Sequence, residues 1–207
     1  MKTPMQITSR GIEELNSALV TDRIGAVSAR IQQLAYRTSF DLKRRCGEIP
    51  VNVSVLGKEN LAPALSAVAE VFRAGLCVSD MAALAFEGEE LGGQAIPRDM
   101  VGLATVSSVA ISGVILKAGI PLDTRFGGIL KLHDYKPVRF VELIEYSGCS
   151  LNPAEILIAG RMTSVAEAAR GGDGKIIANM IEIPVICRPA AVVVIDDRIS
   201  DDSADPT

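Results

Sequence analysis

The apolar residues of this chain change their spacing along its length, and this change limits the folds that it can adopt. Over residues 22–36 they recur every three or four positions, which predicts a helix with Asp22 as its N-cap. Over residues 51–55, Val-Asn-Val-Ser-Val, they alternate with polar residues, which is typical of a half-buried strand. The chain must therefore pack helices and strands around a shared core.

The remaining segments follow the same two patterns. Helices are expected over 7–19, 60–74, 108–118 and 164–171 and from Asn152 onward, and strands over 76–86, 101–106, 125–132, 138–146 and 175–183. Asn152, followed by Pro153 and then Glu155, forms a strong helix start, with Glu155 placed for a capping box. Residues 184–198 fit either element, because their β-branched run favours a strand whereas Pro189 resembles a helix start.

Two antiparallel hairpins are expected among these strands. One joins residues 38–42 to 48–56, and the other joins residues 125–132 to 138–146, each across a short polar turn. Helices mixed with hairpins predict an α+β fold, with a mixed or antiparallel sheet and packed helices, rather than a doubly wound parallel sheet.

Length and charge set the broad class of the protein. The 207 residues can form one domain with a substantial core, and 22% charged residues is ordinary for a soluble protein. The formal net charge of −4 argues against a phosphate-neutralising surface, so DNA contact is expected only through another domain. No signal peptide opens the chain, and the weakly charged stretch 101–122 is expected to be buried rather than to cross a membrane.

The sulfur and imidazole side chains offer no evident metal site. Cys46, Cys77, Cys149 and Cys187 are far apart in the sequence, and His133 is the single histidine. Structural zinc needs four such ligands close together, so we expect no metal or cofactor, and free thiols in a reducing cytoplasm. A nucleophilic Cys149 would need a base, and His133 falls in a predicted turn between strands, so we expect no catalytic pair.

An arginine beside two glycines, in the segment Asp-Thr-Arg-Phe-Gly-Gly, is the first candidate for ligand binding. Arg125 can clamp a carboxylate with two hydrogen bonds, and Gly127 and Gly128 would let the backbone approach a ligand closely. The alternative is an arginine that simply pairs with Asp123 or Glu142.

Hydroxyl-rich helix starts and loops supply the other candidates. A helix start presents free N–H groups and a partial positive charge, which attract anions, although plain helix capping is the alternative. The absence of an evident acid–base pair or phosphate loop favours a binding module over an enzyme. The candidate residues are Ser107, Ser108, Tyr146, Ser147, Thr163 and Ser164.

Several long segments resemble a known family. These are IPRDMVGLATVSSVAISGVILKAGIPLDTRFGGIL (96–130), PVRFVELIEYSGCSLNPAEILIAGRMTSV (137–165) and GKIIANMIEIP (174–184). They resemble the regulatory domain of the NrpR family, euryarchaeal repressors of nitrogen-assimilation genes. ITSRGIEEL resembles the end of that family's winged-helix domain, and DRIGAVSARIQQLAYRTSFD resembles the start of its regulatory domain.

The resemblance implies a function. The family's regulatory domain binds 2-oxoglutarate in a cleft, which weakens the repressor's hold on its operators, and the protein works as a dimer. The ligand has two carboxylates and a keto oxygen, which matches the anion-binding candidates above. The chain is then a cytoplasmic, homodimeric effector-sensing domain that is not an enzyme and that reaches DNA only through a winged helix absent from it.

The resemblance also implies a domain layout. Residues 1–20 are expected to be the remnant of a winged-helix end or a linker helix, 21–197 a single regulatory domain with a ligand cleft, and 198–207 a disordered tail. Two other functions stay open at this point. One is an enzyme acting on a small carboxylic acid through Cys149, Glu142 or Glu145, and the other is a pure dimerisation module.

Overall fold

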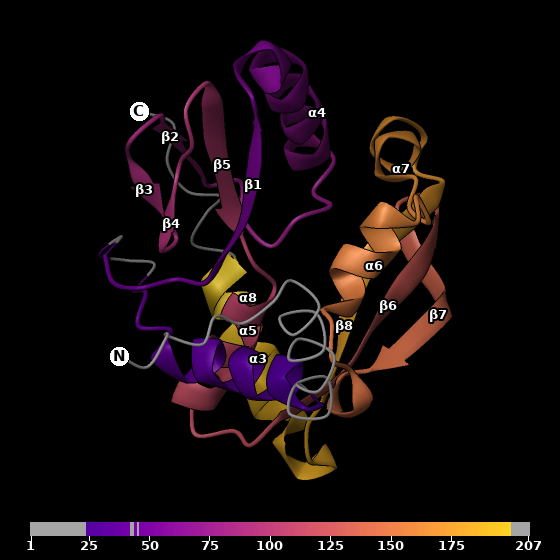
Figure 1. Cartoon of the computed structure of the whole chain (residues 1–207). Coiled ribbons are helices and arrows are strands. Elements are labelled where there is room, and N and C mark those ends of the chain that lie inside the picture. Colours follow the sequence, from indigo (N-terminus) through magenta and orange to yellow (C-terminus); the bar gives the residue numbers. More distant parts are fainter. Residues whose placement is uncertain (1–23, 42–43, 45, 200–207) are drawn as a thin grey trace, which may run out of the picture.

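The computed structural model describes residues 24–41, 44 and 46–199, and it shows two three-stranded sheets with helices packed beside them (Figure 1). The first sheet has the order β1-β5-β2 (Val51–Gly57, Met100–Val106 and Ala82–Phe86), and the second has the order β7-β6-β8 (Lys136–Glu145, Asp123–His133 and Gly174–Glu182). All neighbouring strands in these sheets are antiparallel. The α+β fold that the sequence predicts is therefore confirmed.

The helices surround and connect the two sheets. Their bounds are α3 (Ala26–Arg37), α4 (Leu61–Arg73), α5 (Val109–Lys117), α6 (Pro153–Ala159), α7 (Val165–Gly171) and α8 (Arg188–Ile199). Short 3-10 turns cover Lys58–Asn60 (η1), Tyr146–Gly148 (η2) and Val185–Cys187 (η3). In Figure 1, α3, α5 and α8 lie together below the sheets, α4 lies beside the first sheet, and α6 and α7 lie against the second.

The core has one part in each region of the fold. The central strand β5 is buried over residues 101–104, with Val101 and Ala104 only 1% and 2% exposed. Ile115, Ile120 and Ala191 form a second buried cluster where α5 packs against α8. In the chain, α5 follows β5 and precedes β6, so it connects the two sheets.

The first predicted hairpin is wrong, whereas the second, between β6 and β7, is confirmed. Strand β1 pairs with β5, a distant segment, whereas the described residues 38–41 form no strand and contact 46–48 through an isolated bridge, Asp41 to Cys46, and backbone bonds to Glu48 O. Two side chains explain the local structure: Ser39 Oγ accepts from the Glu48 N–H, and Asp41 Oδ1 accepts from the Arg44 N–H, both at 3.0 Å. Such side-chain bonds compete with a ladder, and the apolar β5 takes β1 as its neighbour instead.

Two predicted helix boundaries also change. Helix α3 begins at Ala26 rather than near Asp22, because Gly25 has a left-handed φ of 82°, which breaks the helical path. Asp22, the predicted helix over 7–19 and the predicted segment 1–20 lie outside the described residues. At the other end, α8 extends two residues into the predicted tail, whose residues 200–207 are likewise outside the described part.

The segment predicted as a strand over 76–86 is regular only in its second half. Strand β2 begins at Ala82, because the preceding residues turn, with Ser79 Oγ accepting from the Met81 N–H at 3.2 Å. The loop after β2 contains a small hairpin between β3 (Glu90–Leu91) and β4 (Gln94–Ala95). The ambiguous stretch 184–198 is the helix α8 after the turn η3, with Pro189 in its first turn.

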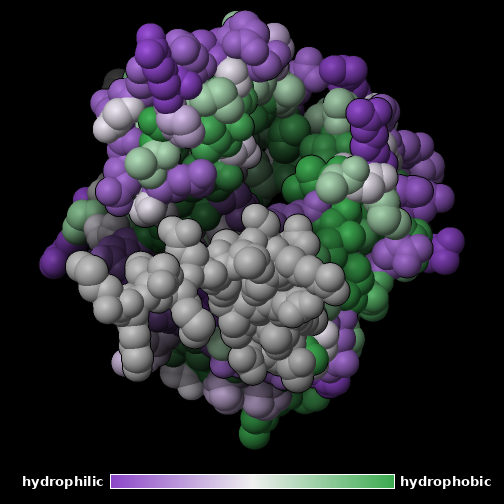
Figure 2. All heavy atoms as spheres, viewed as in Figure 1, coloured by the Kyte–Doolittle hydropathy of each residue, from purple (hydrophilic) through white to green (hydrophobic). Residues whose placement is uncertain are grey.

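The surface is hollowed between the two halves of the molecule. Figure 2 shows a recess between the half that carries α4 and the half that carries α6 and α7, and apolar side chains line its walls. An ion pair bridges these halves, with Arg170 Nε of α7 2.9 Å from Glu70 Oε2 of α4. Among the described residues, no helix has the length and apolar character needed to span a lipid bilayer.

Candidate functional site

A chain of polar side chains joins three parts of the fold near the point where β5 passes into α5. Asn179 Nδ2 donates to Ser108 Oγ at 2.8 Å, and Asn179 Oδ1 accepts from the Tyr146 hydroxyl at 2.6 Å. Ser108 precedes α5, Asn179 lies within β8, and Tyr146 opens the turn η2 after β7. Two residues that the sequence marks as candidates, Ser108 and Tyr146, are thus brought together by Asn179, which it does not mark.

Gly127 makes room for this network. It is the cross-strand partner of Asn179, and a Cβ at this position would overlap the Tyr146 hydroxyl and lie 2.7 Å from the Tyr146 Cζ. The pairing of β6 with β8 skips Arg125, so Thr124 and Gly127 face the same side of the sheet. Thr124 hydrogen-bonds α5 on that side. The network therefore lies between the second sheet and α5.

Burial determines the chemistry of Tyr146. The residue is 3% exposed, and burial, with a smaller contribution from the Cys149 thiol, raises the pKa of the Tyr146 phenol to about 12. The Tyr146 hydroxyl therefore stays a neutral hydrogen-bond donor to Asn179 throughout the physiological pH range.

We expect this burial to be visible in the alkaline stability of the protein. The folded-state pKa of about 12 lies above the ordinary value of about 10, so ionisation of Tyr146 destabilises the folded state only as the pH rises from about 10 towards 12. Tyr146→Phe should reduce the fall in unfolding free energy over this range, measured by urea denaturation at successive pH values. An unchanged fall would contradict an elevated pKa for Tyr146.

Ser107 precedes Ser108 in the sequence and is buried, at 8% exposed. Its Oγ accepts a long bond of 3.4 Å from the Val109 N–H, and its backbone N–H donates to Pro50 O at 2.9 Å. Ser108 makes no side-chain cap to α5. Because the oxygens of Ser107 and Ser108 accept in these bonds, each hydroxyl keeps its proton for another acceptor. The capping alternative therefore holds weakly for Ser107, through its long bond to Val109, and does not hold for Ser108.

Arg125 lies near the start of β6, the central strand of the same sheet, and is engaged by two carboxylates. Its Nη2 is 3.0 Å from Glu145 Oε1, its Nη1 is 3.5 Å from Glu182 Oε2, and its Cζ is 5.1 Å from the centre of the Phe126 ring. The hydrogen bond that Arg125 donates to Glu145 and the charge of Glu182 raise the pKa of Arg125. Arg125 is therefore paired with carboxylates, as the alternative interpretation expects. Its partners are Glu145 and Glu182 rather than Asp123 and Glu142. A ligand carboxylate at Arg125 would compete with these two.

The other candidate residues occupy different places. Gly128 packs its backbone against β7, Ser147 is exposed in η2, and Thr163 is half-buried between α6 and α7. Ser164 precedes α7 and holds β8, since its Oγ accepts from the Lys175 N–H and its N–H donates to Lys175 O, both at 2.9 Å. Ser108, Gly127 and Tyr146 therefore form one cluster with Asn179, which Ser107 adjoins in the sequence, whereas Ser147, Thr163 and Ser164 do not join it.

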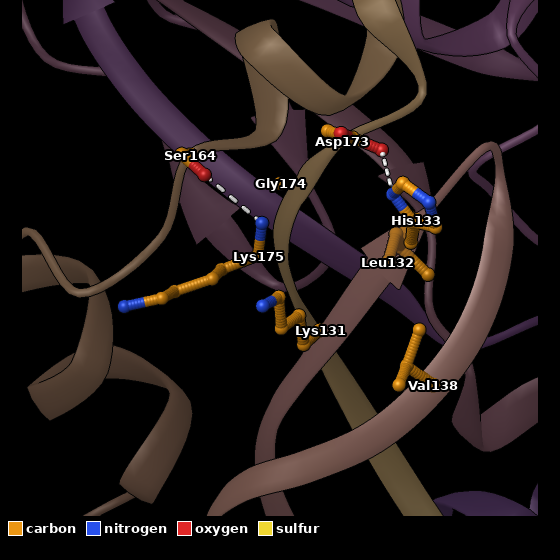
Figure 3. A pocket seen from close by; sticks show the side chains of 8 residues that line it. All are labelled: Lys131, Leu132, His133, Val138, Ser164, Asp173, Gly174 and Lys175. Atoms are coloured by element: carbon orange, nitrogen blue, oxygen red, sulfur yellow. Dashed lines mark hydrogen bonds and ion pairs between the residues drawn. The ribbon is translucent and has the colours of Figure 1, made fainter.

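An open cavity of about 480 Å³ lies at the far end of the second sheet (Figure 3). Its lining residues are Lys131, Leu132, His133, Val138, Ser164, Asp173, Gly174 and Lys175. Asp173 Oδ1 accepts from the Asp134 N–H and contacts His133 Nδ1, each at 2.9 Å. These contacts, led by the backbone bond from Asp134, lower the pKa of the Asp173 carboxyl.

The side chains considered for a catalytic pair, His133 and Cys149, lie far apart in the fold. His133 lies at the turn between β6 and β7, whereas Cys149 follows the opposite end of β7, so strand β7, roughly 30 Å long, separates them. The Cys149 thiol donates to the Glu145 carbonyl oxygen at 3.1 Å. In the part of the chain that the structure describes, no three His, Cys, Asp or Glu side chains gather to hold a metal ion. This arrangement keeps His133 from acting as a base for Cys149.

Asn179 is the functional candidate that sequence reasoning missed. It stands in the strand Lys-Ile-Ile-Ala-Asn-Met-Ile, where it is the only uncharged polar side chain among apolar neighbours. A polar residue within an otherwise apolar strand needs a hydrogen-bonding partner, and this could have marked the position. Its partners come from 71 and 33 positions away in the sequence, so they could not have been named.

Comparison with known proteins matches most of the chain to one family of regulatory domains. The family model described as "NrpR regulatory domains NRD1 and 2" matches residues 24–202. The global nitrogen regulator NrpRI of Methanosarcina mazei is 38% identical over 177 residues, which are 86% of this chain and 54% of that protein. The global nitrogen regulator NrpR of Methanococcus maripaludis is 28% identical over 179 residues, 86% of this chain and 30% of that protein.

The fold is similar to a solved structure. A nitrogen repressor-like protein from Methanococcus jannaschii superimposes with a TM-score of 0.66 at 22% identity, over 83% of this chain and 69% of that one. The chain spans about half the length of the Methanosarcina regulator and less than a third of the Methanococcus maripaludis regulator.

Proposed function

The chain belongs to the family of NrpR regulatory domains, and on this premise we propose that it is the effector-sensing part of a cytoplasmic repressor of nitrogen assimilation. Its effector is a small dicarboxylate, of which 2-oxoglutarate is the first to test. Binding of the effector changes how a winged-helix domain, attached or supplied by a partner, holds DNA.

The polar network at Asn179 is the observation that supports an effector site. It joins the Ser108 hydroxyl to the Asn179 amide, and Ser107 directly precedes Ser108 before the start of α5, whose backbone N–H groups favour an anion. A carboxylate of the effector accepts from the two serine hydroxyls, while Tyr146 holds Asn179 in place. Two of the four side chains are nearly buried, so water competes weakly for these bonds.

Arg125 has a second, separable role in this proposal. It lies two positions before Gly127 on β6 and is the candidate partner for the other carboxylate of the effector. To bind there, the effector must displace Glu145 or Glu182, which are exposed and hold Arg125 at 3.0 Å and 3.5 Å. Exchanging one exposed carboxylate for another yields little net energy, so Arg125 contributes less to affinity than Ser108.

Calorimetric titration with 2-oxoglutarate tests the proposal. The wild-type chain should show saturable binding at millimolar ligand, and Ser108→Ala should weaken it at least about tenfold, the loss of one charge-assisted hydrogen bond. Arg125→Ala should weaken binding by a smaller factor, and Arg139→Ala, an exposed arginine on β7, is the control that should leave it unchanged. If the wild-type chain shows no saturable binding of 2-oxoglutarate, it is not the sensor that we propose.

A homodimer is the second part of the proposal. Val185 and Ile186 in η3 are 88% and 89% exposed, and Val193 in α8 is 57% exposed, which leaves apolar surface for a second copy to cover. Sedimentation equilibrium should give twice the chain mass, and Ile186→Asp should shift the population towards the monomer. A wild-type monomer at micromolar concentration would contradict this part of the proposal while leaving effector binding to its own test.

A further inference from the structure

Three cations lie in one row across the whole second sheet. Arg139 of β7 is the cross-strand partner of Lys131 of β6, and Lys131 is also the partner of Lys175 of β8. Cross-strand partners point to the same face of a sheet, and Figure 3 shows the side chains of Lys131 and Lys175 extending to the same side. The arrangement therefore places like charges next to each other across three strands.

This row is not neutralised by its surroundings. Within the described residues, Lys131, Lys175 and Arg139 make no ion pair, whereas Arg125 and Arg170 each have a carboxylate within 4 Å. Asp173, a carboxylate that lines the same cavity, already accepts from the Asp134 N–H and contacts His133. Like charges directly opposite each other destabilise a sheet by up to about 1 kcal/mol a pair.

The two lysines also open into a cavity that can hold a ligand. Its volume is about 480 Å³, and Lys131, Lys175 and Ser164 line it together with the apolar side chains of Leu132 and Val138. Ser164 Oγ accepts from the Lys175 N–H, so the Ser164 hydroxyl proton is left to donate into the cavity. Cationic and hydroxyl donors beside an apolar wall are the features of a site for a small anion with a carbon skeleton.

We propose that this cavity is a second ligand site, separate from the network at Asn179, and that it binds a phosphate group. Two ammonium groups on opposite strands act as point charges that can converge on one doubly charged phosphate, whereas the charges of a dicarboxylate lie several bonds apart. Lys131 is four residues from Gly127 along β6, about 13 Å, with the buried Ile129 between them. The two sites can therefore be occupied independently.

Titration of the full chain with inorganic phosphate and with glycerol 3-phosphate, at ionic strength held constant with sodium chloride, tests the site. Wild type should bind at least one of them saturably at millimolar concentration, and Lys131→Gln/Lys175→Gln should weaken that binding at least tenfold. Lys117→Gln/Lys136→Gln removes two exposed lysines outside the cavity and should change phosphate affinity less than twofold. Tighter binding of glycerol 3-phosphate would identify the ligand as a phosphorylated metabolite. Tighter binding of inorganic phosphate would identify it as the free ion.

Two further measurements, of thermal stability and of ligand selectivity, separate loss of the site from misfolding. Without phosphate, Lys131→Gln/Lys175→Gln should melt no lower than wild type, since it removes repulsion, and this excludes misfolding as the cause of lost binding. The double variant should keep its response to 2-oxoglutarate, and Ser108→Ala should keep its response to phosphate. Saturable phosphate binding that survives the double substitution, or its absence from wild type, would overturn the site. So would loss of 2-oxoglutarate binding in the double variant, because the cavity would then be the effector site itself.

Discussion

Gly128→Ala should destabilise the protein by about 3 kcal/mol, the upper part of the range for overpacking a core. A Cβ at this position would overlap the Glu142 carbonyl oxygen and lie 3.0 Å from the Glu142 carbonyl carbon and 3.2 Å from the Leu143 Cα. All three are backbone atoms of β7, the strand paired with β6 here, so no rotamer change can relieve the contact. The two strands would have to separate at the centre of the second sheet.

Urea denaturation measures this loss, and Gly148→Ala is the matched control. Gly148 lies in η2 at the end of the same hairpin, has open space around its Cα, and does not need a left-handed φ, so its substitution should stay within about 0.5 kcal/mol of wild type. Equal stabilities for Gly128→Ala and wild type would mean that β6 and β7 are not as close as the structure has them.

The neighbouring glycine should behave differently, because it meets a side chain. In Gly127→Ala the new methyl group meets the Tyr146 ring, which can swing away at the expense of its bond to Asn179. We expect a smaller loss of stability than for Gly128→Ala. Gly127→Ala should weaken effector binding more than Gly128→Ala does, because Asn179 would lose the partner that orients it.

Local sequence signals predicted those parts of the fold whose partners are close in the chain. The Asn152 side chain accepts from the Ala154 N–H at 3.1 Å with Pro153 at the first helical position, as expected for the start of α6. Glu155 departs from the expected capping box, since its carboxylate is paired with the Asn152 side-chain amide at 3.4 Å. Helices α4, α5 and α7 and strands β5 to β8 also lie where periodicity put them.

Long-range partners could not be predicted in the same way. The alternation over 51–55 marks β1 as a strand but says nothing of β5, because period-2 spacing is the same for any neighbour. The sequence marked Arg125 for its two glycines, yet those glycines serve other contacts: Gly127 admits Tyr146, and Gly128 admits the backbone of β7. A glycine signals close approach, and the fold decides what approaches.

Asn179 should be the residue whose substitutions separate stability from effector binding most clearly. Asn179→Ala removes the acceptor of the buried Tyr146 hydroxyl and the donor to Ser108, and it should destabilise the protein by about 2 kcal/mol. Asn179→Asp keeps the shape and accepts from both hydroxyls, so its loss of stability at neutral pH should be smaller. Urea denaturation measures both differences.

The binding of 2-oxoglutarate should show the opposite order. An aspartate at position 179 would place a negative charge beside the carboxylate of the effector, and such repulsion at about 4 Å near a protein surface is of the order of 4 kcal/mol. Asn179→Asp should therefore weaken binding by more than about a hundredfold, further than Asn179→Ala does. Asn52→Asp, on the exposed face of β1, adds the same charge elsewhere and should leave binding unchanged. If Asn179→Asp binds as tightly as wild type, the anion does not lie at this network, and the effector must be sought elsewhere on the domain.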